Sequence, residues 1–473
     1  MSRAIDPQMS FADVELLKQG IEVDPTLKAI AAVLDRQTCL AEGVRRDLQR
    51  GLKKPATGRH GLTAPQVLRS LILMRIKNWD YRELRERISD GLMLRYFTQF
   101  HSRRVPKHDA FSRAVNRLSP ATLEAVNKAV IQRAIALGLE DGKKLRVDTT
   151  VVETDIHHPT DDRLLWDTVR VLSRLVGKLE KVVPVGLGSF RNRTRAARRR
   201  MLEIERMAAR ERHTQQVPIY RALIRMAEQA VLEARGGVER ARSLEKGVRH
   251  RTVVGALEQE ISWYCDLGDT VTRQARRRVL QGEQVPTEEK IYSIFEPHTD
   301  LIKRGKILKP IEFGHKVFLA ESGRGLITQY RVLRGNPSDQ VHVGASRERH
   351  AELFGQAPEL YSSDRGFFSL TNLQACHSAG VKCACIPQAG GKLDSQRQAL
   401  EKSPAFKKGQ RFRAGIEGRI SVLFRGRGMK RVLVQGRERF ELLVGAAVLA
   451  NNLMVIAALM RRASARGRRR AAA

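Results

Sequence analysis

The sequence has few cysteines and few long apolar runs, which argues against a disulfide-stabilised protein and against a membrane protein. Five cysteines among 473 residues are an odd number without a regular framework, which argues against a disulfide scaffold. The first residues, MSRAIDPQMS, lack an apolar signal region, so we expect a reducing cytoplasm as the location. One apolar run, FELLVGAAVLANNLMVIAALM from Phe440, approaches the length of a membrane span but contains Glu441, Asn451 and Asn452. We interpret it as a buried C-terminal helix and expect no membrane partner.

Motifs for nucleotide binding or covalent catalysis are missing as well. The glycine-rich stretch GRGMK lacks the lysine-serine pattern of an ATP site, and no Ser-His-Asp or Cys-His elbow motif is visible. The spacing of Cys376, His377, Cys383 and Cys385 is irregular for zinc. Their apolar neighbours favour buried thiols, and zinc is kept as an alternative interpretation.

Acidic residues are scarce relative to basic ones. Lysine and arginine total 86 against 51 aspartates and glutamates, which gives a formal net charge of +35. Such an excess favours a polyanionic partner, DNA or RNA, over a ribosome-associated or membrane-surface role. The 42% of hydrophobic residues suffice for sizeable cores in two or three domains.

The first part of the chain predicts short, capped helices. Thr63 and Gln66 have the spacing of a capping box, Asp80 and Glu83 have the spacing of another, and a third helix is expected near His108. Several such helices in a basic protein indicate a DNA-binding module of helix-turn-helix type. A helical oligomerisation domain is the alternative.

Strand patterns begin at Lys143. The run KKLRVDTTVVETDI is rich in β-branched residues and places Asp148 on a strand. Residues 164–280 return to a helical pattern, in which the arginine-rich segment 191–212 is either a solvated face or a DNA contact. Two later strand runs flank Gly323-Arg324-Gly325 and predict a hairpin, and another strand run ends at Asp364.

Three acids have the local context that a two-metal phosphodiester enzyme requires. They are Asp148 in LRVDTTVVETD, Asp364 in LYSSDRGFF and Glu417 in RAGIEGRIS. Carboxylates at two strand ends and on one helix can meet, and carboxylate oxygens are the ligands that magnesium and manganese prefer. Without metal, their mutual repulsion would raise at least one pKa. A surface pair between Arg413 and Glu417, four residues apart, is the alternative interpretation of the helix.

Five ordered motifs carry a family resemblance. VDTTVVETDIHHPTD, EPHTDLIKRGK, FGHKVFLAE, SSDRGFFS and RAGIEGRIS resemble the DDE transposases of bacterial insertion sequences, and the first 120 residues resemble their helical N-terminal domain. The resemblance implies an α/β fold with a ribonuclease H-like catalytic core, with Asp148 on its first strand, Asp364 on its fourth and Glu417 on the following helix. It also implies two bound Mg²⁺ ions, which Mn²⁺ could replace.

A domain organisation and partners follow from the resemblance. It predicts a helical DNA-binding domain at 1–140, a core at 141–163 and 290–460, a helical insertion at 164–289 and a basic tail at 461–473, interpreted as a disordered phosphate-binding arm. The expected partner is double-stranded DNA, as terminal inverted repeats and target, bound by a homo-oligomer, most simply a dimer. Water would cleave the strand and the freed 3′-OH would carry out strand transfer. The alternatives are an inactive DNA-binding derivative and a nuclease or RNA-processing hydrolase on the same core.

The sequence departs from the family pattern near Glu417. Many relatives have a tyrosine and a lysine where this chain has Gln410 and Phe424, whereas Arg413 matches, and Arg425 could replace the lysine.

Two further sets of residues are candidates for the active site: possible phosphate contacts and alternative first acids. His315 and Lys316 could contact phosphate, although residues so placed are more often solvated strand ends. Asp155, Asp161 and Asp162 are alternatives to the first acid, which is preferred because it alone lies within the β-branched run.

Overall fold

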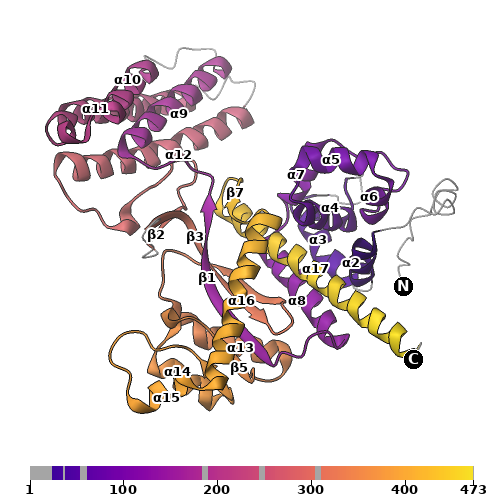
Figure 1. The fold of residues 1–473 in the computed structure, drawn as a ribbon. Coiled ribbons are helices and arrows are strands. Elements are labelled where there is room, and N and C mark those ends of the chain that lie inside the picture. Colours follow the sequence, from indigo (N-terminus) through magenta and orange to yellow (C-terminus); the bar gives the residue numbers. More distant parts are fainter. Residues whose placement is uncertain are drawn as a thin grey trace. The chain divides into compact units, whose positions relative to one another are not determined.

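The computed structural model describes residues 24–35, 38–53, 61–183, 190–243, 251–303 and 310–471. The chain is a mixed α/β protein, as predicted, and divides into two compact units. Unit 1 combines residues up to 153 with those from 315 onward, and unit 2 comprises 154–314. Figure 1 follows the chain through both.

Unit 1 begins with short helices. They are α2 (Pro25–Asp35), α3 (Thr38–Gln49), α4 (Ala64–Lys77), α5 (Tyr81–Asp90), α6 (Leu92–Phe97), α7 (His108–Val115) and α8 (Pro120–Ala136). The predicted capping box opens α4, where the Gln66 amide donates to the Thr63 hydroxyl and the Gln66 side chain accepts from the Thr63 amide. The Asp80 carboxylate caps α5 by accepting from the amides of Arg82 and Glu83. These caps satisfy amides that have no partner inside the helix.

A mixed sheet forms the centre of unit 1. The long strand β1 (Lys144–Thr154) pairs in parallel with β5 (Leu360–Ser362), which pairs in parallel with β6 (Cys383–Cys385). On the other side of β1 lies β3 (Ile311–Ser322), which forms the predicted hairpin with β4 (Ile327–Val332). The short β7 (Arg431–Val432) also pairs with β1.

Helices follow the later strands of unit 1. They are α13 (Val343–Phe354), α14 (Leu370–Ser378), α15 (Ser395–Lys402) and α16 (Pro404–Gly426). The last of these packs on β5 and β6, so the helix that carries Glu417 lies against the strand that ends before Asp364.

The last helix, α17 (Arg437–Ala471), contains the long apolar run. It packs against α8, α4 and α2 (Figure 1), and 78% of its most apolar window is buried. Among the described residues it is the one helix long and apolar enough to cross a membrane, but its burial confirms the prediction of a core helix. The side chain of Asn452, within the run, accepts from the amide of Ile327 on β4 and donates to its carbonyl, both at 2.8 Å. It also donates to the side chain of Asn127.

The predicted disorder of the tail is wrong for residues 461–471, which continue α17. Arginine and alanine have high helix propensity, and no proline interrupts this stretch.

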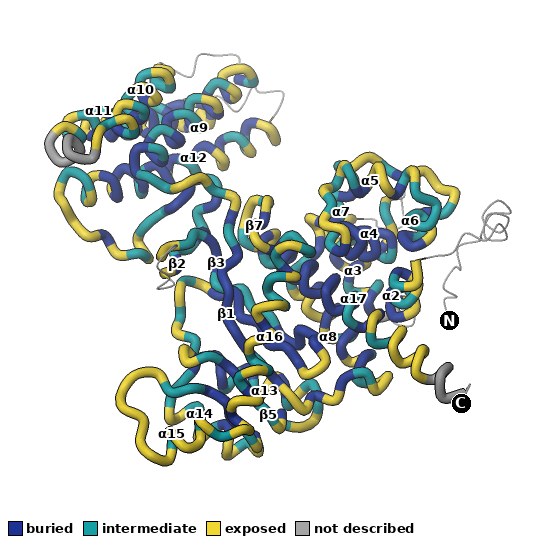
Figure 2. Tube along the Cα trace, in the orientation of Figure 1, coloured by how far each residue is buried: buried dark blue, intermediate teal, exposed yellow. Residues whose placement is uncertain are grey.

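Unit 2 is helical apart from its connections to the sheet. Its helices are α9 (Asp161–Val182), α10 (Thr194–Arg206), α11 (Ala209–Ser243) and α12 (Arg251–Ala275). The helix α12 continues as a π-helical turn, Arg276–Leu280. A strand, β2 (Asp300–Lys303), pairs with the first residues of β3. The leucine stripe predicted on α9 lies in the core of the unit (Figure 2), with Leu165, Leu172, Leu175 and Leu179 fully buried.

Candidate active site

The parallel register of β1 and β5 places two of the predicted acids side by side. Lys144 lies opposite Leu360 and Arg146 lies opposite Ser362. Two residues further along the same register, Asp148 lies beside Asp364, which follows the end of β5 and caps a 3-10 turn. Because adjacent strands lie about 4.8 Å apart, both carboxylates occupy one edge of the sheet.

Arg413 on α16 connects these two acids to the third. Its Nη2 lies 3.0 Å from Oδ2 of Asp148 and 3.6 Å from Oδ2 of Asp364, while its Nη1 lies 2.9 Å from Oε1 of Glu417. Glu417 is one helical turn after Arg413, and 67% of its side chain is exposed, whereas Asp148 is buried. The three predicted acids therefore converge on one guanidinium group. The ion pair between Arg413 and Glu417, which was the alternative interpretation of the helix, is also present and is one of these three contacts.

The pKa values of the two aspartates are raised. Burial raises the pKa of Asp148 to about 6, against the opposing attraction of Arg413, and the negative charge of Asp364 adds to the rise. Burial likewise raises the pKa of Asp364, again opposed by Arg413. Burial therefore disfavours the ionised form of both carboxylates by more than the guanidinium group of Arg413 favours it.

Replacing Asp148 by asparagine should stabilise the metal-free protein at neutral pH. A carboxyl whose pKa is about 6 in the folded chain and 3.8 otherwise costs stability when it is ionised. The gain should reach about 2–3 kcal/mol above pH 6 and disappear below about pH 4, where both states are protonated. Calorimetric unfolding in EDTA from pH 4 to pH 8 measures this difference. A gain that is independent of pH would contradict the assigned ionisation.

A fourth acid, Asp339, lies beside the cluster and was missed by sequence reasoning. Its Oδ1 accepts from the Thr149 hydroxyl at 3.0 Å and lies 2.8 Å from Nζ of Lys316. A Cβ placed on Gly366 would lie 3.1 Å from Oδ1 of Asp364 and 3.2 Å from Oδ2 of Asp339, so these two carboxylates face a shared space. Asp339 is the first residue of the 3-10 turn Asp339–His342 after β4, and no periodic pattern in the surrounding sequence NPSDQ distinguishes it.

Hydrogen bonds from side chains to backbone carbonyls hold α16 against the sheet next to the acids. The Gln410 amide group donates to the carbonyls of Cys385 at 2.7 Å and Ser363 at 3.2 Å, and the Ser362 hydroxyl donates to the carbonyl of Gly409 at 2.9 Å. A side chain at Gly409 would collide with Sγ of Cys385. Gln410, at the position where the family resemblance predicts a tyrosine, thus anchors the helix one turn before Arg413.

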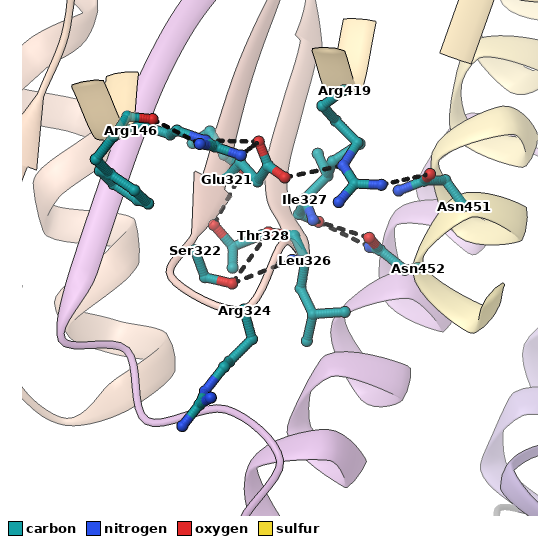
Figure 3. Close-up of polar contacts among 12 residues, drawn as sticks. Arg146, Glu321, Ser322, Arg324, Leu326, Ile327, Thr328, Arg419, Asn451 and Asn452 are labelled. Carbon is teal, nitrogen blue, oxygen red and sulfur yellow. Dashed lines mark hydrogen bonds and ion pairs between the residues drawn. The ribbon is translucent and has the colours of Figure 1, made fainter. Parts of the chain in front are cut away.

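A buried ion-pair network holds the same helix from its other side (Figure 3). Glu321 at the end of β3 is fully buried, with Oε2 2.7 Å from Nη2 of Arg146 and Oε1 2.8 Å from Nε of Arg419. Arg146, two residues before Asp148, also donates to the Phe412 carbonyl at 2.6 Å. Arg419, two residues after Glu417, donates in addition to Asn451 on α17. The strand of the first acid and the helix of the third are therefore joined through one carboxylate.

The auxiliary residues predicted from the sequence have different positions. His315 is fully buried, with its ring 4.9 Å from that of Phe440, so the predicted phosphate contact has no accessible surface and is wrong for this structure. Lys316 lies next to the acids but is engaged by Asp339 and by the Pro337 carbonyl. Arg425 is exposed two turns beyond Glu417, about 12 Å along the helix.

Two of the three alternative first acids, Asp161 and Asp162, are engaged within unit 2. Asp161 pairs with Arg278 at 2.7 Å and accepts from Gln274, and Asp162 accepts from the Tyr220 hydroxyl at 3.1 Å. These bonds stabilise the start of α9, whereas Asp148 lies beside Asp364.

The donor set suits a hard divalent cation, although Arg413 lies where the carboxylates converge. Within the described ranges, no three or more histidine, cysteine or acidic side chains are arranged as a ready metal site. The acids nevertheless supply oxygen donors from two strand ends and a helix, which are the ligand type that such a cation prefers. Asp148, Asp364 and Glu417 are thus the residues that could hold metal once Arg413 releases them.

Comparison with known proteins yields one match. Residues 15–117 match a family model described as "Transposase domain (DUF772)". No curated protein and no solved structure matches the chain. The matched range includes α2 to α7 and ends before β1, so it supports a transposase-family protein without including the three acids.

Proposed function

We propose that this protein is a DDE transposase, which binds the terminal inverted repeats of a mobile element and cleaves DNA with Asp148, Asp364 and Glu417. The observation that carries the proposal is the convergence of these acids on Arg413, in a chain of net charge +35. The transposase-domain match at residues 15–117 supports it independently, because that range lies outside the acidic cluster. A ribonuclease H-like core and binding of DNA ends by the N-terminal helices belong to the same proposal.

The three carboxylates would hold two Mg²⁺ ions, and Mn²⁺ could replace them. When bound, the ions would activate water and stabilise the departing 3′ oxygen. Arg413 neutralises part of the acidic charge in this structure, and cations would take over that role. Its guanidinium group could then bind a phosphate oxygen, since arginine forms paired bonds to phosphate as well as to carboxylate. Gln410 and the Glu321 network would keep α16 in place meanwhile.

The test is cleavage of a linear duplex that carries candidate element ends, taken from the DNA flanking the gene. Purified full-length protein should nick this duplex at the element end in Mg²⁺ or Mn²⁺, and EDTA should abolish nicking. A duplex of scrambled end sequence is the matched substrate control. Absence of nicking with every metal and every flanking end would refute the enzyme assignment.

The products distinguish the proposal from its alternatives. A transposase should join the freed 3′-OH to a target plasmid, which sequencing of the junctions detects. Nicking without joined products would favour a nuclease, and specific binding without nicking would favour an inactive DNA-binding derivative. The proposed setting is the cytoplasm, with the protein acting as a homo-oligomer, most simply a dimer, on the nucleoid.

A further inference from the structure

Arginines on one face of α10 line a groove in unit 2. The groove has a volume of about 920 Å³, and Arg195, Arg198, Arg199 and Arg206 contribute to its wall. All four are exposed, while Ala197, Met201 and Ile204 on the opposite face of the helix are buried in the core (Figure 2). The amphipathic helix therefore presents a basic stripe at the surface.

These arginines lack acidic partners among the described residues. None of the four forms an ion pair with a residue in the described part of the chain, and Glu203, which also lines the groove, pairs with Arg200. Several other arginines of unit 2 are matched with carboxylates, namely Arg163, Arg170, Arg193, Arg235, Arg242, Arg276, Arg277 and Arg278. The four groove arginines are set apart by lying together on one face of one helix, where they line a single groove.

The stripe has the dimensions of a phosphate-binding surface. From Arg195 to Arg206 the helix rises about 16 Å. A DNA duplex presents roughly ten phosphate charges over that length, enough for each arginine to reach one. The remaining lining consists of Leu202, Met207 and Ile219, which cannot read the hydrogen-bonding pattern of bases, with Glu203 and one amide side chain, Gln215. Because arginines dominate its polar lining, the groove is suited mainly to the DNA backbone.

We infer that the α10 groove is a second, sequence-independent DNA-binding surface, separate from the acidic cluster and from the N-terminal helices. The choice of DNA as occupant rests on the proposed function, whereas the affinity for a polyanion rests on the four unpaired arginines alone. The role of the helical insertion would then be to hold DNA that the catalytic residues do not contact.

The test measures binding of the full-length protein to a 40-base-pair duplex of random sequence across a series of salt concentrations. Replacing Arg195, Arg198, Arg199 and Arg206 together by glutamine should lower affinity at least about tenfold. It should also reduce the slope of log affinity against log salt by about 3 to 4, because each lost phosphate contact removes about 0.9. Replacing the same residues by lysine should keep most of the slope, since the charge is retained.

A matched variant controls for the loss of charge in general. Arg221, Arg225, Arg251 and Arg273 are exposed in unit 2, lie outside the groove and have no ion pair to a described residue. Their replacement by glutamine should change the slope by less than about 1. Equal slopes for the two glutamine variants would overturn the inference, as would a glutamine loss that lysine does not rescue.

Tighter binding of a 40-base-pair RNA duplex through the same arginines would overturn DNA as the occupant. Two further outcomes separate this inference from the proposed function. If the protein cleaves element ends while the groove variant binds random DNA like the control variant, the groove inference fails and the proposed function stands. If no cleavage occurs but the groove variant alone loses its salt-dependent binding, the groove inference stands without the enzyme.

Discussion

Replacing Asp148 by asparagine, Asp364 by asparagine or Glu417 by glutamine should each lower metal-dependent nicking of element-end DNA by about 10³-fold or more. The amides keep the size of the side chains but remove the negative oxygens that would hold the cations, and metal contributes several kcal/mol to such reactions. Initial rates under single-turnover conditions measure the loss. Binding to the same DNA should remain, because it depends on phosphate contacts away from the acids.

The matched control is Glu359→Gln. Glu359 precedes β5, is exposed and pairs with Lys382 at 3.1 Å, so its loss should leave the nicking rate nearly unchanged. The catalytic role of Glu417 is the one that this experiment tests most strictly. Its exposed contact with Arg413 could equally be an ordinary surface ion pair, which contributes about a few tenths of a kcal/mol. If Glu417→Gln retains the full rate, the third acid lies elsewhere, and Asp339 is the nearest candidate.

The sequence predicted the strands of the site because their signals are local. A β-branched run surrounds Asp148, and a short strand run ends just before Asp364, as β1 and β5 show. The hairpin of β3 and β4 and the buried helix α17 are confirmed for the same reason, since alternation and apolar length are visible within one segment. That the two acids lie side by side depends on the register of β1 with β5, which a single sequence leaves undetermined.

The rest of the site depends on contacts between distant segments. Arg146 and Glu321 are 175 positions apart, and nothing in either strand pattern indicates that they pair. Asp339 reaches the cluster from the 3-10 turn after β4, and its place beside Lys316 and Thr149 is a contact between distant segments. The wrong expectation for His315 has the same origin, because its burial follows from Phe440, more than a hundred residues later. Local periodicity tells which face of a strand is apolar but not which side chain covers it.

Replacing Glu321 by glutamine should lower the free energy of unfolding by about 3–5 kcal/mol and abolish most nicking. Glu321 is fully buried between Arg146 and Arg419, and the amide would leave two largely buried guanidinium groups without a counter-charge. The helix α16 should loosen first, because Arg419 belongs to it and Arg146 donates to its Phe412 carbonyl. Urea unfolding measures the stability, and hydrogen exchange of peptides from α16 measures the local effect.

Two variants separate the stability of the Glu321 network from its effect on the site. Glu83→Gln removes one partner of an exposed pair with Arg87 and should cost less than about 0.5 kcal/mol. Replacing Glu321, Arg146 and Arg419 together by methionine should recover most of the stability, because apolar packing can substitute for a buried ion pair. Nicking should remain low in this triple variant, since the Arg146 bond to the Phe412 carbonyl that holds α16 is lost. Full recovery of nicking would show that the network contributes stability alone and does not position Glu417.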